Sequence, residues 1–305
     1  MARSLVEEDA NPLEVGRFER GADSPIANTM FANLVSVTFS AFDRFEPLPS
    51  PGDKSKGVQY AYIGLKRTGL TKDGEPLSPK SPDQLSSEFS RSLSVCRQGT
   101  RLSRWRGTLE TLEADPLFRD AEITALANES ADDGKLQRLS HELFEELSSG
   151  HKIVLMTITK LVETVEEKTL VLLDEPEAHL HPPLLAALIR ALSDLLINRN
   201  GVAIIATHSP VVLQEVPRGC VWKIRRSGTK VVAERPDIET FGENVGILTR
   251  EVFGLEVTAS GFHKMLREAV DEFPDFDQIL QRFGGELGGE ARAMVRALLG
   301  ARRHS

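Results

Sequence analysis

The chain has 305 residues, of which 40% are hydrophobic and 27% are charged, a composition typical of a globular protein with enough length to bury a core. The net charge of −8 excludes a chain-wide basic field for nucleic acid and leaves only a local patch for such contact. Two cysteines, Cys96 and Cys220, exclude a disulfide framework and favour a reducing, cytoplasmic setting.

No segment of the sequence predicts membrane insertion. The first fifteen residues lack the apolar core of a signal peptide. The longest apolar-rich run, "PPLLAALIRALSDLLIN", contains Arg190 and Asp194 and is too short to span a bilayer. We therefore expect no membrane partner.

Residues 1–80 predict a first lobe that contains two strands. Residues 34–42 alternate apolar with polar side chains, which predicts a half-buried strand of an antiparallel sheet, and residues 58–66 predict a second strand beside it. The proline- and lysine-rich residues 46–57 between them predict an exposed, flexible loop.

Residues 81–146 have helical spacing and many charges, so they predict an inserted helical subdomain. Residues 97–107 of this segment hold four arginines and Trp105. They could contact a nucleic-acid backbone, but an exposed helical face is the simpler explanation.

Residues 147–236 alternate helices with short, continuously apolar strands, which predicts a parallel sheet covered on both faces. Near the end of this segment, residues 220–234 predict a hairpin that turns at Ser227 and Gly228. Residues 237–305 predict a mostly helical C-terminal region.

The motif "LSSGH" (147–151) precedes a long predicted helix. The small side chains of Ser148, Ser149 and Gly150 would let backbone N–H groups approach an anion at the positive end of the helix dipole. A serine that only caps the helix is a common alternative.

The motif "TLVLLDEPEAHLHP" (169–182) places two acids, Asp174 and Glu175, at the end of a predicted buried strand. One carboxylate in such a position can hold Mg²⁺ while its neighbour polarises an attacking water. The alternative is a strand end whose acids simply face solvent.

The motif "VAIIATHSP" (202–210) is a second predicted buried strand, and it ends in Thr207, His208 and Ser209. A single histidine here could be a structural hydrogen-bonding group. Because the carboxyl ends of parallel strands meet in one crevice, we expect His208 to neighbour Asp174 and Glu175.

In this order and spacing, the three motifs resemble the signature loop, Walker B strand, D-loop and switch histidine of an ABC-type ATPase. The resemblance is closest to the SMC, RecF and OLD-like branch, whose members often have DEPE-x-x-LHP. It implies an α/β fold with a P-loop-NTPase-like parallel sheet of the ABC/SMC head type, an antiparallel strand pair and the inserted helical subdomain. Residues 1–80 would be the remainder of the first ATPase lobe, and residues 147–236 the ATPase core.

The resemblance implies roles for the acids and the histidine in binding and hydrolysing ATP. Asp174 would hold Mg²⁺, and Glu175 would orient or deprotonate the attacking water. His208 would contact the γ-phosphate.

The resemblance also implies a partner. Ser148, Ser149 and Gly150 would reach the nucleotide of a second head, and His181 lies in the segment that lines the seam between heads. The partner would be a second copy or a second ATPase head, and the pair would serve DNA or a DNA-acting effector protein.

Several features depart from the ABC pattern. His151 stands where glutamine is usual, Ser149 where glycine is frequent and Glu177 where threonine is frequent, and the glutamine of the Q-loop is not assignable. The chain contains no phosphate-binding motif GxxxxGK(S/T), so it resembles the last two-thirds of an ATPase. We therefore expect ATP hydrolysis from a complete form and none from this chain alone.

Two alternatives stay open. The chain could be a non-hydrolysing interaction module that keeps the dimer surface. A more remote alternative is a metal-dependent hydrolase built on the acids and on His179-x-His181.

Overall fold

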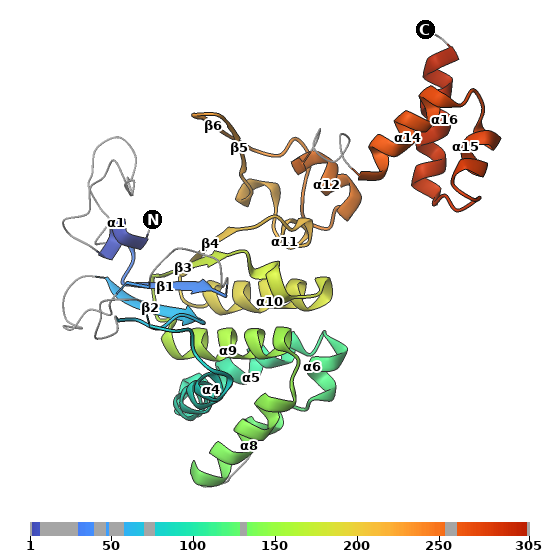
Figure 1. Ribbon diagram of the computed structural model, residues 1–305. Coiled ribbons are helices and arrows are strands. Elements are labelled where there is room, and N and C mark those ends of the chain that lie inside the picture. The colour runs from blue at the N-terminus through green and yellow to red at the C-terminus, as the bar shows by residue number, and fades with distance from the viewer. Residues whose placement is uncertain are drawn as a thin grey trace. The chain divides into compact units, whose positions relative to one another are not determined.

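The computed structural model describes residues 2–6, 30–39, 47–48, 58–69, 77–128, 133–253 and 261–303. They form an α/β fold in two compact units, Met1–Val212 and Leu213–Ser305, where the sequence suggested four segments (Figure 1). Apart from Pro47 and Leu48, the predicted flexible loop 46–57 lies outside the described residues. None of the helices in these ranges is both long enough and apolar enough to cross a membrane.

The first unit is built on a four-stranded sheet with the order β2-β1-β3-β4. Its strands are β1 (Asn33–Thr38), β2 (Gln59–Gly64), β3 (Thr169–Asp174) and β4 (Val202–Ala206). All three pairings are parallel, which confirms the predicted parallel sheet around the two acid- and histidine-bearing strands. The prediction that the second of these strands is buried is wrong: β4 is the edge strand, and Val202 and Ile204 are 46% and 40% exposed.

The predicted antiparallel pairing of the first two strands is wrong. β1 and β2 run parallel, in register from Asn33 opposite Gln59 to Thr38 opposite Gly64. Alternation reports which side chains share a face and not the direction of the neighbouring strand. The chain between Thr38 and Gln59 is long enough for the crossover that parallel strands require, and Ser36 is buried because both faces of the sheet are covered at β1.

Each face of the sheet has its own apolar cluster. Val35, Val171 and Leu173 face the long helices α9 (Ser149–Thr164) and α10 (Pro182–Ile197), which lie along one side of the sheet in Figure 1. On the other face, a cluster that includes Leu34 and Leu170 packs against α1 (Ala2–Val6). Because successive side chains of a strand point to opposite faces, each continuously apolar strand contributes residues to both hydrophobic layers.

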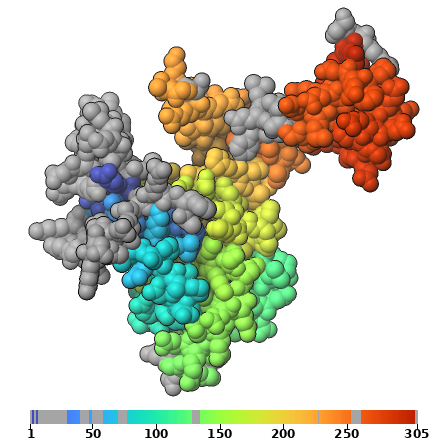
Figure 2. All heavy atoms as spheres, viewed as in Figure 1, coloured from blue at the N-terminus to red at the C-terminus, as the bar shows by residue number. Residues whose placement is uncertain are grey.

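The predicted helical segment 81–146 is helical. Its elements are α4 (Pro82–Cys96), α5 (Thr100–Leu112), α6 (Pro116–Asp120), α7 (Ala125–Asn128) and α8 (Asp133–Glu146). Side chains from these helices share one core with α9 and α10, and Figure 2 shows the blue-green and green residues as one continuous body.

Trp105 shows why α5 is not simply an exposed face. Its side chain is 0% exposed, and its Nε1–H donates to Thr159 Oγ1 at 3.0 Å. The neighbouring Arg101 and Arg104 bond to Glu166 and to the carbonyl of Val165. The expected exposed face is therefore wrong for Trp105, which is not available to stack on a base.

The second unit contains a β-hairpin and several helices. β5 (Lys223–Ser227) and β6 (Lys230–Glu234) are antiparallel, and Gly228 has φ of 59°, so the predicted hairpin and its turn are confirmed. The other described elements from residue 210 onward are α11 (Pro210–Gln214), the short helix η3 (Arg218–Cys220), α12 (Val245–Phe253), α14 (Gly261–Glu272), α15 (Phe276–Arg282) and α16 (Gly289–Arg303).

Candidate functional site

The carboxyl ends of β3 and β4 bring the predicted acid and histidine together. The strands are neighbours, with Asp174 opposite Ala206, and the N–H of Glu175 donates to the carbonyl of Ala206 at 2.9 Å. Glu175 Oε1 lies 3.3 Å from His208 Nε2. The prediction that these two side chains are neighbours is confirmed.

Glu175 has a left-handed backbone conformation, with φ of 44° and ψ of 57°. This conformation is rare for a residue with a Cβ and costs on the order of 1–3 kcal/mol. It turns the chain sharply from β3 into the short helix η2 (Pro176–His179). The strain falls on the residue that the sequence selects as the catalytic carboxylate, and such strain is common at functional sites.

Glu177 holds η2 against the end of β4. Its Oε1 accepts hydrogen bonds from Thr207 Oγ1 at 2.8 Å and from the N–H of His208 at 2.5 Å. The sequence marked Glu177 only as a replacement for threonine and missed this positioning role. The signal was its place two residues past the acid pair, on the same turn.

The groups at this edge of the sheet fit Mg²⁺ by their chemistry. Asp174 and Glu175 supply carboxylate oxygens, which are the donors that Mg²⁺ prefers. Glu177 Oε2 is buried and has no hydrogen-bond donor among the described residues, so a cation or water would satisfy it. Asp174 and Glu175 also line a cavity of about 20 Å³, which has room for about one water and not for a nucleotide.

The serine of the signature-like motif caps the following helix. Ser148 is the N-cap of α9: its Oγ accepts from the N–H of His151 at 3.4 Å and lies 2.6 Å from His151 Nδ1. The capping alternative therefore describes the local structure at Ser148. Binding of an anion by Ser148, Ser149 and Gly150 stays a prediction.

Gly150 lies where α9 meets η2. A Cβ at this position would stand 2.7 Å from the carbonyl oxygen of His179, so only glycine allows this close approach. The fold thus places the signature-like turn directly against the segment that follows the acid pair.

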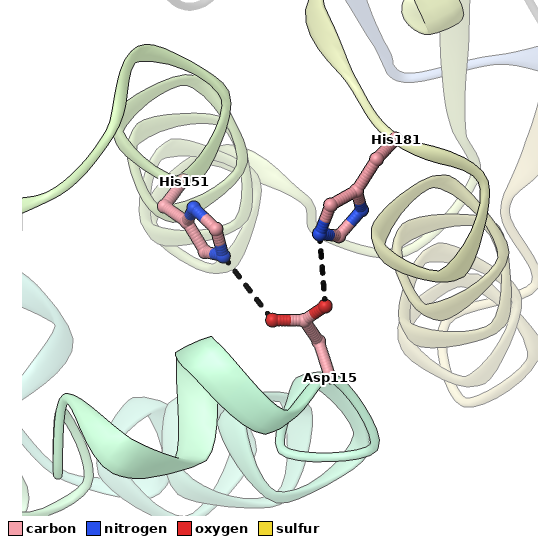
Figure 3. A group of neighbouring side chains, drawn as sticks. All are labelled: Asp115, His151 and His181. Carbon is pink, nitrogen blue, oxygen red and sulfur yellow. Dashed lines mark hydrogen bonds and ion pairs between the residues drawn. The ribbon is translucent and has the colours of Figure 1, made fainter.

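His181 bonds away from the acid pair. Its Nδ1 accepts from the N–H of Leu184 at 3.1 Å and caps α10, while its Nε2 lies 3.2 Å from Asp115 Oδ2. His151 Nε2 lies 3.1 Å from Asp115 Oδ1. Figure 3 shows both imidazole rings directed at this one carboxylate from different helices.

Asp115 was not found by the sequence analysis, and its only local signal is an aspartate before a proline, typical of a helix N-cap. Its side chain is 2% exposed. Burial by itself raises the pKa of Asp115, but hydrogen bonds from His151 and the Phe118 N–H, together with His181, outweigh burial and lower that pKa. Asp115 is therefore an ionised, fully surrounded carboxylate.

Part of the chain is similar to a known protein family. Residues 66–214 match the family described as "AAA domain, putative AbiEii toxin, Type IV TA system". This stretch contains the helical segment, β3, the acid pair, β4 and His208. The match covers 149 of the 305 residues, and the parallel α/β sheet of this stretch is consistent with it.

A relative can also be named. The chain is 44% identical to the protein ea59 of Escherichia phage lambda over 315 aligned residues, which cover 98% of this chain and 59% of ea59. The chain is thus related to ea59 along nearly its whole length and spans about three-fifths of the length of that relative.

Proposed function

We propose that this chain supplies the acid pair, signature-like turn and switch histidine of an ATP-hydrolysing head of the SMC/RecF/OLD-like ABC type. The observation that carries the proposal is Glu175 itself. It follows a buried strand of a parallel sheet in a strained conformation, and its carboxylate lies 3.3 Å from His208.

The proposed roles follow from what each group can do. Asp174 would hold Mg²⁺, which neutralises phosphate charge when it is bound. Glu175 would orient the attacking water and accept its proton, and His208 would donate a hydrogen bond to the terminal phosphate. The proposed head also needs a phosphate-binding loop, and no GxxxxGK(S/T) occurs within these 305 residues.

The proposal includes a second head. The turn of Ser148, Ser149 and Gly150 packs against the η2 segment, so the two segments that would face a partner's nucleotide form one surface of this chain. Two such heads would close on ATP and separate after hydrolysis. DNA or a DNA-acting effector as the final partner rests on family resemblance alone.

The second candidate is a non-hydrolysing interaction module that uses the same surface for assembly. The missing GxxxxGK(S/T) favours it, because this loop supplies most of the contacts to the phosphates.

The melting temperature with and without MgATP separates the candidates. A ligand that binds only the folded protein raises the melting temperature, so in the first case MgATP should stabilise a version of the chain that also carries a phosphate-binding loop. The effect should need Mg²⁺ and disappear in Asp174→Asn. Glu167→Gln is the matched control, because this exposed acid lies at the opposite end of β3. No response to MgATP would favour the interaction module.

A second measurement tests the catalytic carboxylate. Removal of a general base slows the reaction by about 10²–10⁴-fold, so in a version that carries a phosphate-binding loop Glu175→Gln should slow turnover by this factor while binding persists. Light scattering after gel filtration should then show an ATP-dependent dimer for Glu175→Gln that decays in the wild type. Equal turnover in both proteins would exclude Glu175 as the base.

A further inference from the structure

The carboxylate of Asp115 joins the starting points of three helices. Asp115 itself caps α6, with Oδ1 accepting from the N–H of Phe118 at 2.9 Å. His151 belongs to the first turn of α9 and bonds to the cap of that helix, Ser148. His181 caps α10. One buried anion thus holds the N-terminal ends of α6, α9 and α10 together.

The hydrogen bonds fix the proton on His181. The N–H of Leu184 can only donate, so Nδ1 of His181 must be an unprotonated acceptor. The single ring proton therefore sits on Nε2, where it is donated to Asp115. His151 presents its own Nε2 to the other oxygen of the same carboxylate, and Ser148 Oγ–H satisfies its Nδ1.

The same proton assignment argues against a metal ion among these side chains. Ligand atoms of Asp115, His151 and His181 all lie within 4.8 Å of one another, which is compatible with zinc by distance. A metal would need the lone pair of His181 Nε2, and the displaced proton would have to sit on Nδ1, facing the N–H of Leu184. Two donors would then oppose each other at the N-cap.

The hydrogen bonds from His151 and His181 to Asp115, which we call the tie, join the signature-like turn to the η2 segment. These two segments are also in steric contact. The carbonyl of His179 would stand 2.7 Å from a Cβ at position 150, and the side chain of Leu180 would lie 3.5 Å from it. The signature-like turn and the η2 segment are thus held by a steric contact on one side and by charge-assisted hydrogen bonds on the other. Bonds to a buried charge are stronger than bonds between neutral groups.

We propose that Asp115 is a positioning residue whose carboxylate makes the signature-like turn and the segment 176–181 move as one unit. The proposal rests on the proposed function for its purpose, since these two segments would face the nucleotide of a second head. The link between the N-terminal ends of α9 and α10 can be tested without nucleotide. Failure of the tie and failure of the ATPase proposal are therefore distinguishable.

Asp115→Asn should weaken the hydrogen bonds to the two histidines and leave the N-cap of α6 in place. Asparagine caps a helix about as well as aspartate, so α6 should keep its cap. The amide cannot accept from both imidazole N–H groups, so the link between α9 and α10 should weaken. We expect amide hydrogen exchange on the order of tenfold faster at Lys152 and at Leu185, with no change at Arg119 in α6.

Variants of the two histidines test the tie from its other ends. His181→Asn keeps a capping side chain on α10 but loses the contact with Asp115, so exchange should rise at Lys152 in the other helix. His151→Leu should raise exchange at Leu185, and His151→Gln, which keeps an N–H donor, should restore it. The control is His179→Asn, an exposed histidine two residues before His181, which should change neither amide.

The outcomes decide the proposal. Changes confined to the mutated helix in every variant would reduce Asp115 to an ordinary cap and overturn it. If Asp115→Asn does not fold, the histidine variants still give the answer. A rise in melting temperature with equimolar Zn²⁺ that is lost in Asp115→Asn would make the cluster a metal site and would also overturn the proposal. No response to Zn²⁺ supports the hydrogen-bonded tie.

Discussion

Glu175 Oε1 and His208 Nε2 lie 3.3 Å apart, although they follow different strands of the sheet. The two side chains are 50% and 77% exposed, so their attraction contributes only about 0–1 kcal/mol to stability. Stability therefore does not account for the arrangement. Two groups that can transfer or hold a proton are instead placed at the edge of the sheet where parallel strands end.

The strain at Glu175 predicts that glycine stabilises this position. Glu175→Gly should raise the free energy of unfolding by about 1 kcal/mol, because glycine adopts φ of 44° without steric penalty. Urea denaturation measures the change. Glu122, with φ of 48°, is a matched control outside the site, and its replacement by glycine should have a similar effect. A loss of stability in Glu175→Gly alone would mean that the carboxylate itself stabilises the fold.

At Gly150 we expect the opposite effect on stability, because a larger side chain there should destabilise the fold. Gly150→Ala should lower the free energy of unfolding by about 1–3 kcal/mol, because the added Cβ stands 2.7 Å from the carbonyl of His179 and forces the segments apart. Gly107→Ala in α5 is the control, since its Cβ meets no atom within 4 Å. It should stabilise by about 0.5–1 kcal/mol. Equal effects of the two substitutions would contradict the close approach.

The lowered pKa of Asp115 predicts an acid-sensitive contribution to stability. A carboxyl whose pKa is lower in the folded state than in the unfolded state stabilises the fold above its unfolded pKa, about 3.9, and loses this contribution as pH falls through the folded pKa. The difference in unfolding free energy between wild type and Asp115→Asn should be constant above pH of about 5 and shrink below about 4. Chemical denaturation across this pH range measures the difference in unfolding free energy. A difference that does not change with pH would contradict the lowered pKa of Asp115.

Lys223 and Glu251 form an ion pair in the second unit, and its contribution to stability can be measured. Lys223 Nζ donates to Glu251 Oε1 at 2.8 Å, and the lysine side chain is 5% exposed. The hydrogen bond from Lys223 lowers the pKa of Glu251, and the same bond raises the pKa of Lys223.

Lys223→Met should therefore destabilise the second unit by about 2–3 kcal/mol, because it leaves a partly buried carboxylate without its partner. Adding Glu251→Gln should recover part of the loss. Hydrogen exchange of the β5 and β6 amides is the measurement. Simple addition of the two single effects would show that the side chains are not coupled.

The sequence by itself determined the order and type of the elements around the site. Continuous apolar runs gave β3 and β4, the spacing of apolar residues gave the helices between them, and acids and a histidine at the strand ends marked the crevice. The neighbourhood of Glu175 and His208 followed, because parallel strands end at one edge. The hairpin turn at Gly228 was equally local, since a positive φ selects glycine.

Only the tertiary structure decided the relations that no local pattern encodes. The direction of β2 beside β1 depends on how the intervening chain returns to the sheet, and the burial of Trp105 depends on the helices packed around it. Asp115 meets His151 and His181 only because α6, α9 and α10 converge at their N-terminal ends. Sequence patterns record each residue's preference for its own backbone, whereas a buried carboxylate with partners on two other helices depends on where the whole chain brings those helices.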